Sequence, residues 1–157
     1  MTTSEAAPSA RTTSAAARAG LAILAVFQGV IGVWALLAPA SFYRSFPMSG
    51  HAWVSLLPPY NEHLIRDVGE LSLALTVVLT AAAVTGQRLL SAVAVGALAV
   101  YTVPHAVFHA LHLEGFGTVD AVAQTVGFAV QLLVAAVVAW LLWRDHPARP
   151  SRVKARQ

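Results

Sequence analysis

The sequence predicts an all-α fold: a four-helix transmembrane bundle with up-down-up-down helices and an interfacial loop between the first two helices. Two observations support this prediction. The chain has 157 residues, of which 57% are hydrophobic and only 11% charged, whereas about 25% of the residues in a soluble domain are charged. Four segments are also long and apolar enough to cross a bilayer, which requires about 20 residues.

Each predicted span ends at a residue that interrupts or bounds a membrane helix. The first span, residues 17–37, stops before a proline, and the second, residues 62–85, stops before a glycine. The third covers residues 88–112 and the fourth residues 119–143, with two glycines in the link between them and an arginine after the last. Proline and glycine are the strongest local breakers of helices. Because the link between the second and third spans is very short, these helices should form an antiparallel hairpin.

The segments around the spans have a different composition. Residues 1–16 are rich in Thr, Ser, Ala and Pro, so we expect a disordered N-terminus, followed by a transmembrane domain over residues 17–143. The first apolar run is longer than the roughly 7–15 residues of a signal-peptide core, so we expect it to be retained as a span. Residues 41–61 are rich in aromatic side chains, which favour the membrane interface, and should form a short helix or cap there.

Basic residues are distributed unevenly along the chain. With the N-terminus inside, eight of the ten Lys and Arg residues face the cytoplasm, five of them in a basic tail at residues 144–157. Lys and Arg favour the cytoplasmic side of a membrane, and a basic tail there attracts anionic lipid. We therefore predict a multi-pass protein of the plasma membrane with both termini in the cytoplasm. We expect the protein to contact the lipid bilayer and not to bind nucleic acid. Whether it forms a homo-oligomer or binds another membrane protein stays open.

Two polar stripes lie near the predicted outer ends of the second and third spans. Each stripe places three residues at positions i, i+4 and i+7, which share one face of an α-helix. The stripes are His63, Asp67 and Glu70 on one helix, and His105, His109 and His112 on the other. Ionisable side chains are costly inside a bilayer, so their presence there suggests a function.

Antiparallel packing should set the two stripes level with each other. The expected neighbours are His63 with His112, Asp67 with His109, and Glu70 with His105. Imidazole and carboxylate groups suit divalent transition metals, and helical bundles commonly carry such sites, so these six residues are candidate metal ligands. Other candidate ligand-binding residues are Glu62, Arg66, Tyr101, Asp120 and Gln124. Pro104 should kink the third span and widen this end into a pocket.

The cluster allows several functions. It could bind a metal ion or a small polar ligand, relay protons, ligate haem, or serve a membrane oxidoreductase or hydrolase. The alternative is a structural or accessory protein in which the polar groups only tie the helices together. The chain has no cysteine, which excludes disulfides and thiolate ligands. The catalytic residues, and whether the protein is an enzyme, stay open.

Three motifs carry a resemblance to known proteins. FYRSFP, PPYNEHLIRDVG and VPHAVFHALHLEG resemble segments of small four-span actinobacterial membrane proteins that are mostly uncharacterised, and the resemblance covers about residues 20–143. The overall plan is also similar in architecture to DoxX-like four-helix membrane proteins. The resemblance implies a four-span fold, and it implies no established reaction, cofactor or catalytic residue.

Overall fold

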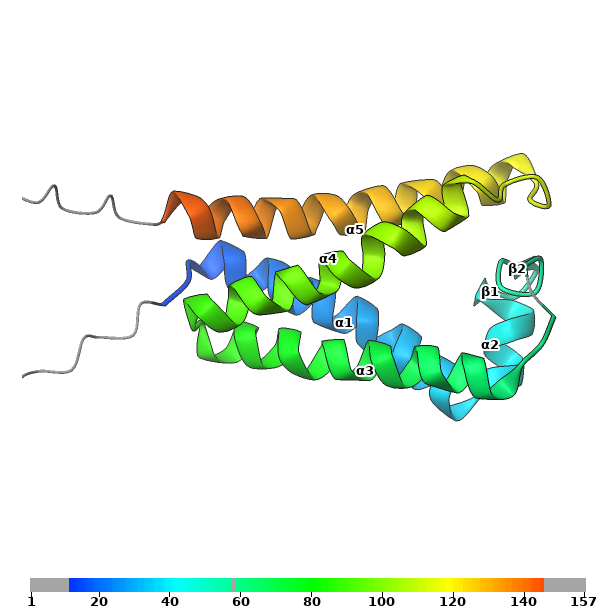
Figure 1. Ribbon diagram of the computed structural model, residues 1–157, viewed down its shortest axis with the longest axis horizontal. Coiled ribbons are helices and arrows are strands. Elements are labelled where there is room, and N and C mark those ends of the chain that lie inside the picture. Colours follow the sequence, from blue (N-terminus) through cyan, green and yellow to red (C-terminus); the bar gives the residue numbers. More distant parts are fainter. Residues whose placement is uncertain (1–11, 58, 146–157) are drawn as a thin grey trace, which may run out of the picture.

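The computed structural model describes residues 12–57 and 59–145, and most of these residues are helical (Figure 1). Four long helices form the bundle: α1 (Ala15–Leu37), α3 (Glu62–Thr85), α4 (Arg88–Ala110) and α5 (Thr118–Arg144). Each of the four is long and apolar enough to span a membrane. The predicted all-α, four-helix fold is thus confirmed, with every helix boundary within two residues of its predicted position. Consecutive long helices run in opposite directions (Figure 1).

The helix boundaries follow from local chemistry. The side chain of Ser14 accepts a hydrogen bond from the backbone N–H of Ala17, and Asn61 accepts one from Leu64. These are N-caps, which pair the free N–H groups at the start of a helix. Helix α3 ends at Gly86, whose φ of 64° is in the left-handed region that glycine adopts without strain. The chain therefore reverses at once into α4.

A short helix and a hairpin occupy the segment between α1 and α3. Helix α2 (Pro39–Ser45) begins directly after α1, with proline in its first turn, where no N–H is needed. Strand β1 (Pro47–Met48) then pairs antiparallel with β2 (His51–Ala52), and the two are joined through Gly50, whose φ is 90°. Residues 41–61, which were predicted to form a short helix or cap, contain the hairpin and all of α2 except its first two residues. We call residues 39–57 the cap segment.

Helices α1 and α3 approach each other closely because glycines face each other where they cross. A Cβ atom added at Gly69 would lie 2.7 Å from the backbone nitrogen of Leu36 and 3.0 Å from the carbonyl oxygen of Gly32. Only glycine leaves room for two helix backbones at such a distance, and small residues have this role in many membrane bundles.

Two arginines cap the ends of this helix pair in a reciprocal way. Arg18, near the start of α1, donates to the carbonyl oxygens of Ala83 and Val84 at the end of α3, at 2.7 and 3.0 Å. Arg66, near the start of α3, donates to the carbonyl oxygen of Leu36 at the end of α1. The last carbonyls of a helix have no partner within the helix, so each arginine supplies one from the neighbouring helix.

The bundle is closed at one end and splayed at the other. At the closed end, all four long helices share an apolar core whose largest buried members include Leu21, Leu79, Leu98 and Val138. Toward the other end, α4 and α5 diverge from α1 and α3, and the cap segment lies at the opening (Figure 1). Pro104 lies inside α4, the helix that leads away from α3 toward α5 (Figure 1).

Candidate functional site

A cavity of about 280 Å³ lies in the splayed half of the bundle. Its walls come from all five helices and from the residues that follow β2, and they are mostly aliphatic and aromatic. None of the described residues that line it is Asp, Glu, Lys or Arg. The cavity is therefore an apolar, uncharged space with a limited number of polar groups.

The polar groups of the cavity gather on α1, α4 and α5. The amide, imidazole and aliphatic hydroxyl groups on these three helices are those of Gln28, Thr102, His105, His109, Gln124 and Gln131. Tyr43, Trp53, Asn61 and Tyr101 also line the cavity. Gln28 and Thr102 are each 1% exposed, Gln124 is 2% exposed and Gln131 is 7% exposed. Buried polar groups in a membrane span need partners, so the partners of these side chains determine what the cavity can do.

A hydrogen-bonded chain joins the two inward-facing histidines to α5. The Nδ1 atom of His109 lies 2.7 Å from Oε1 of Gln124, and its Nε2 atom lies 3.0 Å from Nε2 of His105. An amide oxygen only accepts hydrogen bonds, so neutral His109 carries its proton on Nδ1 and accepts from the Nε2–H of His105. The Phe128 ring lies 5.1 Å from each imidazole ring. The pair is thus held in one arrangement.

Four other polar atoms of the cavity have no partner within the described part of the chain. They are Nε2 of Gln28, Gln124 and Gln131, and Oγ1 of Thr102, and all four are buried. Leaving a buried donor unpaired costs about 1–3 kcal/mol, and the cost is not recovered from lipid. All four atoms therefore leave hydrogen-bonding capacity unused around one cavity.

These groups lie at two levels along α4 and α5. His109 and Gln124 are in contact, and because the two helices are antiparallel, the residues seven positions away on each lie level with one another about 10 Å deeper. Those residues are Thr102 and Gln131. Gln28 of α1 lines the same cavity, and we call these three residues the polar floor: Gln28, Thr102 and Gln131.

The predicted stripe on α3 is not part of this cavity. His63 pairs with Asp67 of its own helix at 3.1 Å, and His63 and Glu70 are exposed. The residues of α3 that line the cavity include Leu64 and Ile65, which lie on another face of that helix.

His112, at the end of the α4 stripe, does not line the cavity either. Its Nδ1 atom lies 2.7 Å from the backbone carbonyl oxygen of Phe108, and the two rings stack at 4.1 Å. The expected pairing of the two stripes is therefore replaced by other contacts, because α4 diverges from α3 toward α5 at this end (Figure 1). Among residues 12–57 and 59–145, no group of three or more His, Asp or Glu side chains is placed to hold a metal ion.

The other predicted ligand-binding residues divide into two groups. Tyr101 and Gln124 line the cavity, whereas the others make contacts outside it. Arg66 binds Glu62 on its own helix at 2.8 and 2.9 Å. Tyr60, just before α3, donates to Glu62, and desolvation and then the charge of this carboxylate raise the pKa of the phenol.

Asp120, the last of the predicted residues, holds the cap segment. Its Oδ1 atom lies 2.6 Å from Nδ1 of His51 and 2.9 Å from Nε1 of Trp53. Trp53 also lines the cavity, so this carboxylate fixes one of its walls.

The three residues of the polar floor are not among the candidate ligand-binding residues from the sequence, and Thr102 is the member with the weakest sequence signal. Threonine is common in membrane helices, where its hydroxyl usually bonds to its own helix. Its signal is positional, because Thr102 lies three residues before His105 and seven before His109 and so shares their face of α4.

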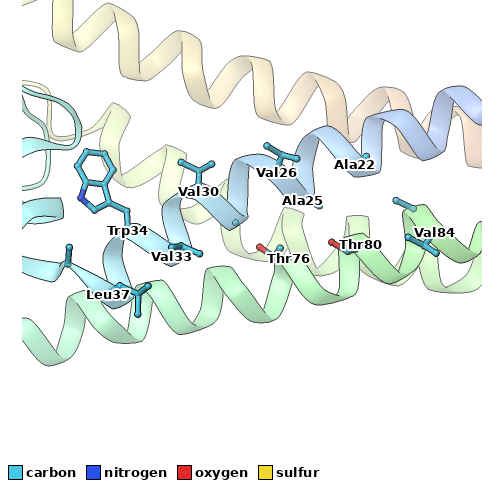
Figure 2. A pocket seen from close by; sticks show the side chains of 13 residues that line it. Ala22, Ala25, Val26, Val30, Val33, Trp34, Leu37, Thr76, Thr80 and Val84 are labelled. Carbon is cyan, nitrogen blue, oxygen red and sulfur yellow. The ribbon is translucent and has the colours of Figure 1, made fainter.

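A second hollow, of about 840 Å³, runs along the outside of α1 and α3 (Figure 2). Its walls are mostly valines and small residues, together with Trp34 and Leu37, and the hydroxyls among its described lining residues are those of Thr76 and Thr80. Thr76 already donates to the carbonyl oxygen of Ser72 at 2.8 Å. This hollow has no convergent polar groups and has the character of a lipid-facing surface.

Comparison with known proteins gives no further assignment. No family model, curated protein or solved structure matches this chain. The resemblance to actinobacterial four-span proteins and to DoxX-like proteins therefore stays a prediction.

Proposed function

We propose that this protein binds a small amphipathic molecule in the cavity between its splayed helices. The observation that supports this proposal is the polar floor, three buried side chains with unpaired hydrogen-bonding atoms beneath apolar walls. Ligand sites are typically apolar concavities with a few placed polar groups, and they lie between the helices of bundles. A purely structural cluster would instead pair its polar groups with one another, as Arg66 and Glu62 do.

The cavity faces the outside of the cell in this proposal. It lies at the end of the bundle away from Ala15, where α1 starts, and away from Arg144, where α5 ends (Figure 1). The distribution of Lys and Arg supports the cytoplasmic placement of both of those ends in the plasma membrane. A molecule would then enter from the outer leaflet or from the outer surface.

Blocking the cavity tests this function directly. A Cβ atom added at Gly127, which lines the cavity, would meet no other atom within 4 Å, and the same holds at Gly96, which does not line it. We therefore compare Gly127→Phe with Gly96→Phe, purify each protein in detergent, and identify extracted small molecules by mass spectrometry. A molecule should be retained by the wild type and by Gly96→Phe, and depleted at least severalfold from Gly127→Phe. Identical extracts from all three proteins would contradict the proposal.

A metal ion is the second candidate occupant, and one distance favours it. The Nε2 atoms of His105 and His109 converge to 3.0 Å. Two nitrogens bound to one tetrahedral Zn²⁺ at about 2.0–2.1 Å each lie roughly 3.3–3.4 Å apart, so a small outward shift would let both imidazoles bind one ion. The bond from His109 to Gln124 resembles the outer contacts that orient metal-binding histidines.

Metal analysis distinguishes this second candidate. The protein is incubated with Zn²⁺, desalted and measured by elemental mass spectrometry, alongside a variant that combines His105→Ala and His109→Ala. A metal site predicts about one ion per chain, lost in the double variant and kept in His63→Ala. Wild-type protein without retained metal would exclude this candidate.

A further inference from the structure

The polar floor indicates which head group the cavity accepts. Building on the function proposed above, we infer that the ligand is an uncharged molecule with an apolar body and a carbonyl oxygen. The carbonyl oxygen accepts from two of the three floor side chains, Gln28, Thr102 and Gln131, and the body lies against the aromatic walls. The inference rests on the hydrogen-bonding direction of the floor, the absence of charge around it, and the depth at which it lies.

The unpaired atoms of the floor are donors. The Nε2 atoms of Gln28 and Gln131 can only donate hydrogen bonds, and the hydroxyl of Thr102 has a hydrogen to give. All three are buried without a partner among the described residues. A carbonyl oxygen has two lone pairs, so a single such oxygen can accept from two of these groups. A hydrocarbon would leave all of them unpaired.

The lining excludes charged head groups. A carboxylate or phosphate needs a cationic partner when it is taken out of water, and no Lys or Arg is among the described lining residues. An ammonium group needs an anionic partner, and no Asp or Glu is among them either. An amine would also bring further donors to a floor that consists of donors. A neutral ketone or ester oxygen satisfies both conditions.

The size and depth of the cavity set the shape of the ligand. At the share of about 30 Å³ that each water molecule occupies in the liquid, a cavity of about 280 Å³ holds roughly ten non-hydrogen atoms. The floor lies about 10 Å below the level of His109 and Gln124, whereas Trp53 and Leu57, which also line the cavity, belong to the cap segment. The carbonyl end therefore enters first, and the apolar body extends toward the cap segment.

The test uses 2-nonanone labelled with ¹³C at the carbonyl, because this ketone has about the number of non-hydrogen atoms that the cavity holds. Its binding to the full-length protein in detergent is followed by infrared spectroscopy, because hydrogen bonding lowers the carbonyl stretching frequency. The wild type should show a saturable band at lower frequency than the ketone in empty micelles. Thr102→Val and Gln131→Leu should each weaken binding roughly fivefold and move the band back toward the micelle value.

Matched variants separate the head group from the fold. Thr125→Val removes a hydroxyl from α5 that bonds only to its own helix and should bind like the wild type. Thr102→Ser keeps the hydroxyl and should restore the shifted band. The thermal midpoint of each variant shows that it is folded, and Gln131→Met serves in place of Gln131→Leu if the latter does not fold.

The outcomes distinguish this inference from the function on which it rests. If nonane or octanoate competes as well as the ketone, or if the bound ketone shows an unshifted carbonyl band, the inference is overturned and the cavity remains a ligand site. If neither the ketone nor nonane nor octanoate binds saturably, and Gly127→Phe changes nothing, the proposed function fails as well.

Discussion

The imidazole of His51 lies 2.6 Å from the carboxylate of Asp120, which joins the β-hairpin of the cap segment to the first turn of α5. Trp53 donates to the same carboxylate oxygen at 2.9 Å. One acidic side chain therefore fixes two residues of a segment that is otherwise held mainly by aromatic contacts, such as Phe46 with Trp53 at 6.0 Å. Since Trp53 also lines the cavity, this contact holds the cavity wall in place.

Asp120→Ala should loosen the cap segment without unfolding the bundle. The change removes two hydrogen bonds from His51 and Trp53 to a carboxylate, so we expect a larger population of molecules in which the cap segment is released. In a protein whose other tryptophans are replaced by Phe, acrylamide should quench Trp53 more strongly. Asp145→Ala, at the opposite end of α5, is the control and should leave quenching unchanged. Equal quenching in all three proteins would show that Asp120 does not hold the cap segment.

Gly69→Ala should destabilise the pairing of α1 with α3. The new methyl group would lie 2.7 Å from the backbone nitrogen of Leu36, and overpacking of this kind typically costs about 1–3 kcal/mol. Gly96→Ala is a matched control, because its methyl group would meet nothing within 4 Å and alanine favours a helix by roughly 0.5–1 kcal/mol. Thermal midpoints in detergent should therefore fall for the first variant and stay level or rise for the second. A midpoint for Gly69→Ala as high as that of Gly96→Ala would rule out the close crossing.

Hydropathy and helix breakers were enough to predict the fold. The four spans and the turn at Gly86 depend on interactions between residues close in sequence. Which face of each helix points into the bundle depends on the helices that pack against it. The sequence predicted these orientations less completely than it predicted the helix boundaries. On α4 the expected inward face was found for His105 and His109, because both line the cavity.

Helix α3 shows why the rest could not be predicted. It has a polar face with His63, Asp67 and Glu70, and an apolar face with Leu64 and Ile65. The cost of charge in lipid favours turning the polar face inward, whereas packing against the aromatic residues of the cap segment favours the apolar face. Ile65 is buried with Phe42 of α2, so packing decides the outcome. This contact joins residues far apart in sequence, and periodicity alone does not reveal it.

Removing the two arginine caps should have additive effects. Arg18→Met and Arg66→Met each leave helix-terminal carbonyls without a partner, at an expected cost of about 1 kcal/mol for groups that are partly exposed. The two sites lie about 27 Å apart along α1, and effects at such a distance usually add. The double variant should therefore lose the sum of the two single losses in thermal unfolding. Glu62→Gln keeps an acceptor for Arg66, so its loss of thermal stability should be smaller than that of Arg66→Met. A double variant whose loss differs from the sum of the single losses would show that the two caps act through a shared element.

Gln124→Leu should change the tautomer of His109. In the wild type the amide oxygen of Gln124 accepts from Nδ1 of His109 at 2.7 Å, which places the proton on Nδ1. Without that acceptor, an unpaired buried N–H would cost about 1–3 kcal/mol, so the proton should move to Nε2 and the bond to His105 should reverse. The ¹⁵N chemical shifts of the imidazole distinguish the two forms. His112 is an internal control, because its Nδ1 donates to the backbone carbonyl of Phe108 and its shifts should stay constant. Unchanged shifts for His109 in the variant would mean that Gln124 does not determine which nitrogen of His109 carries the proton.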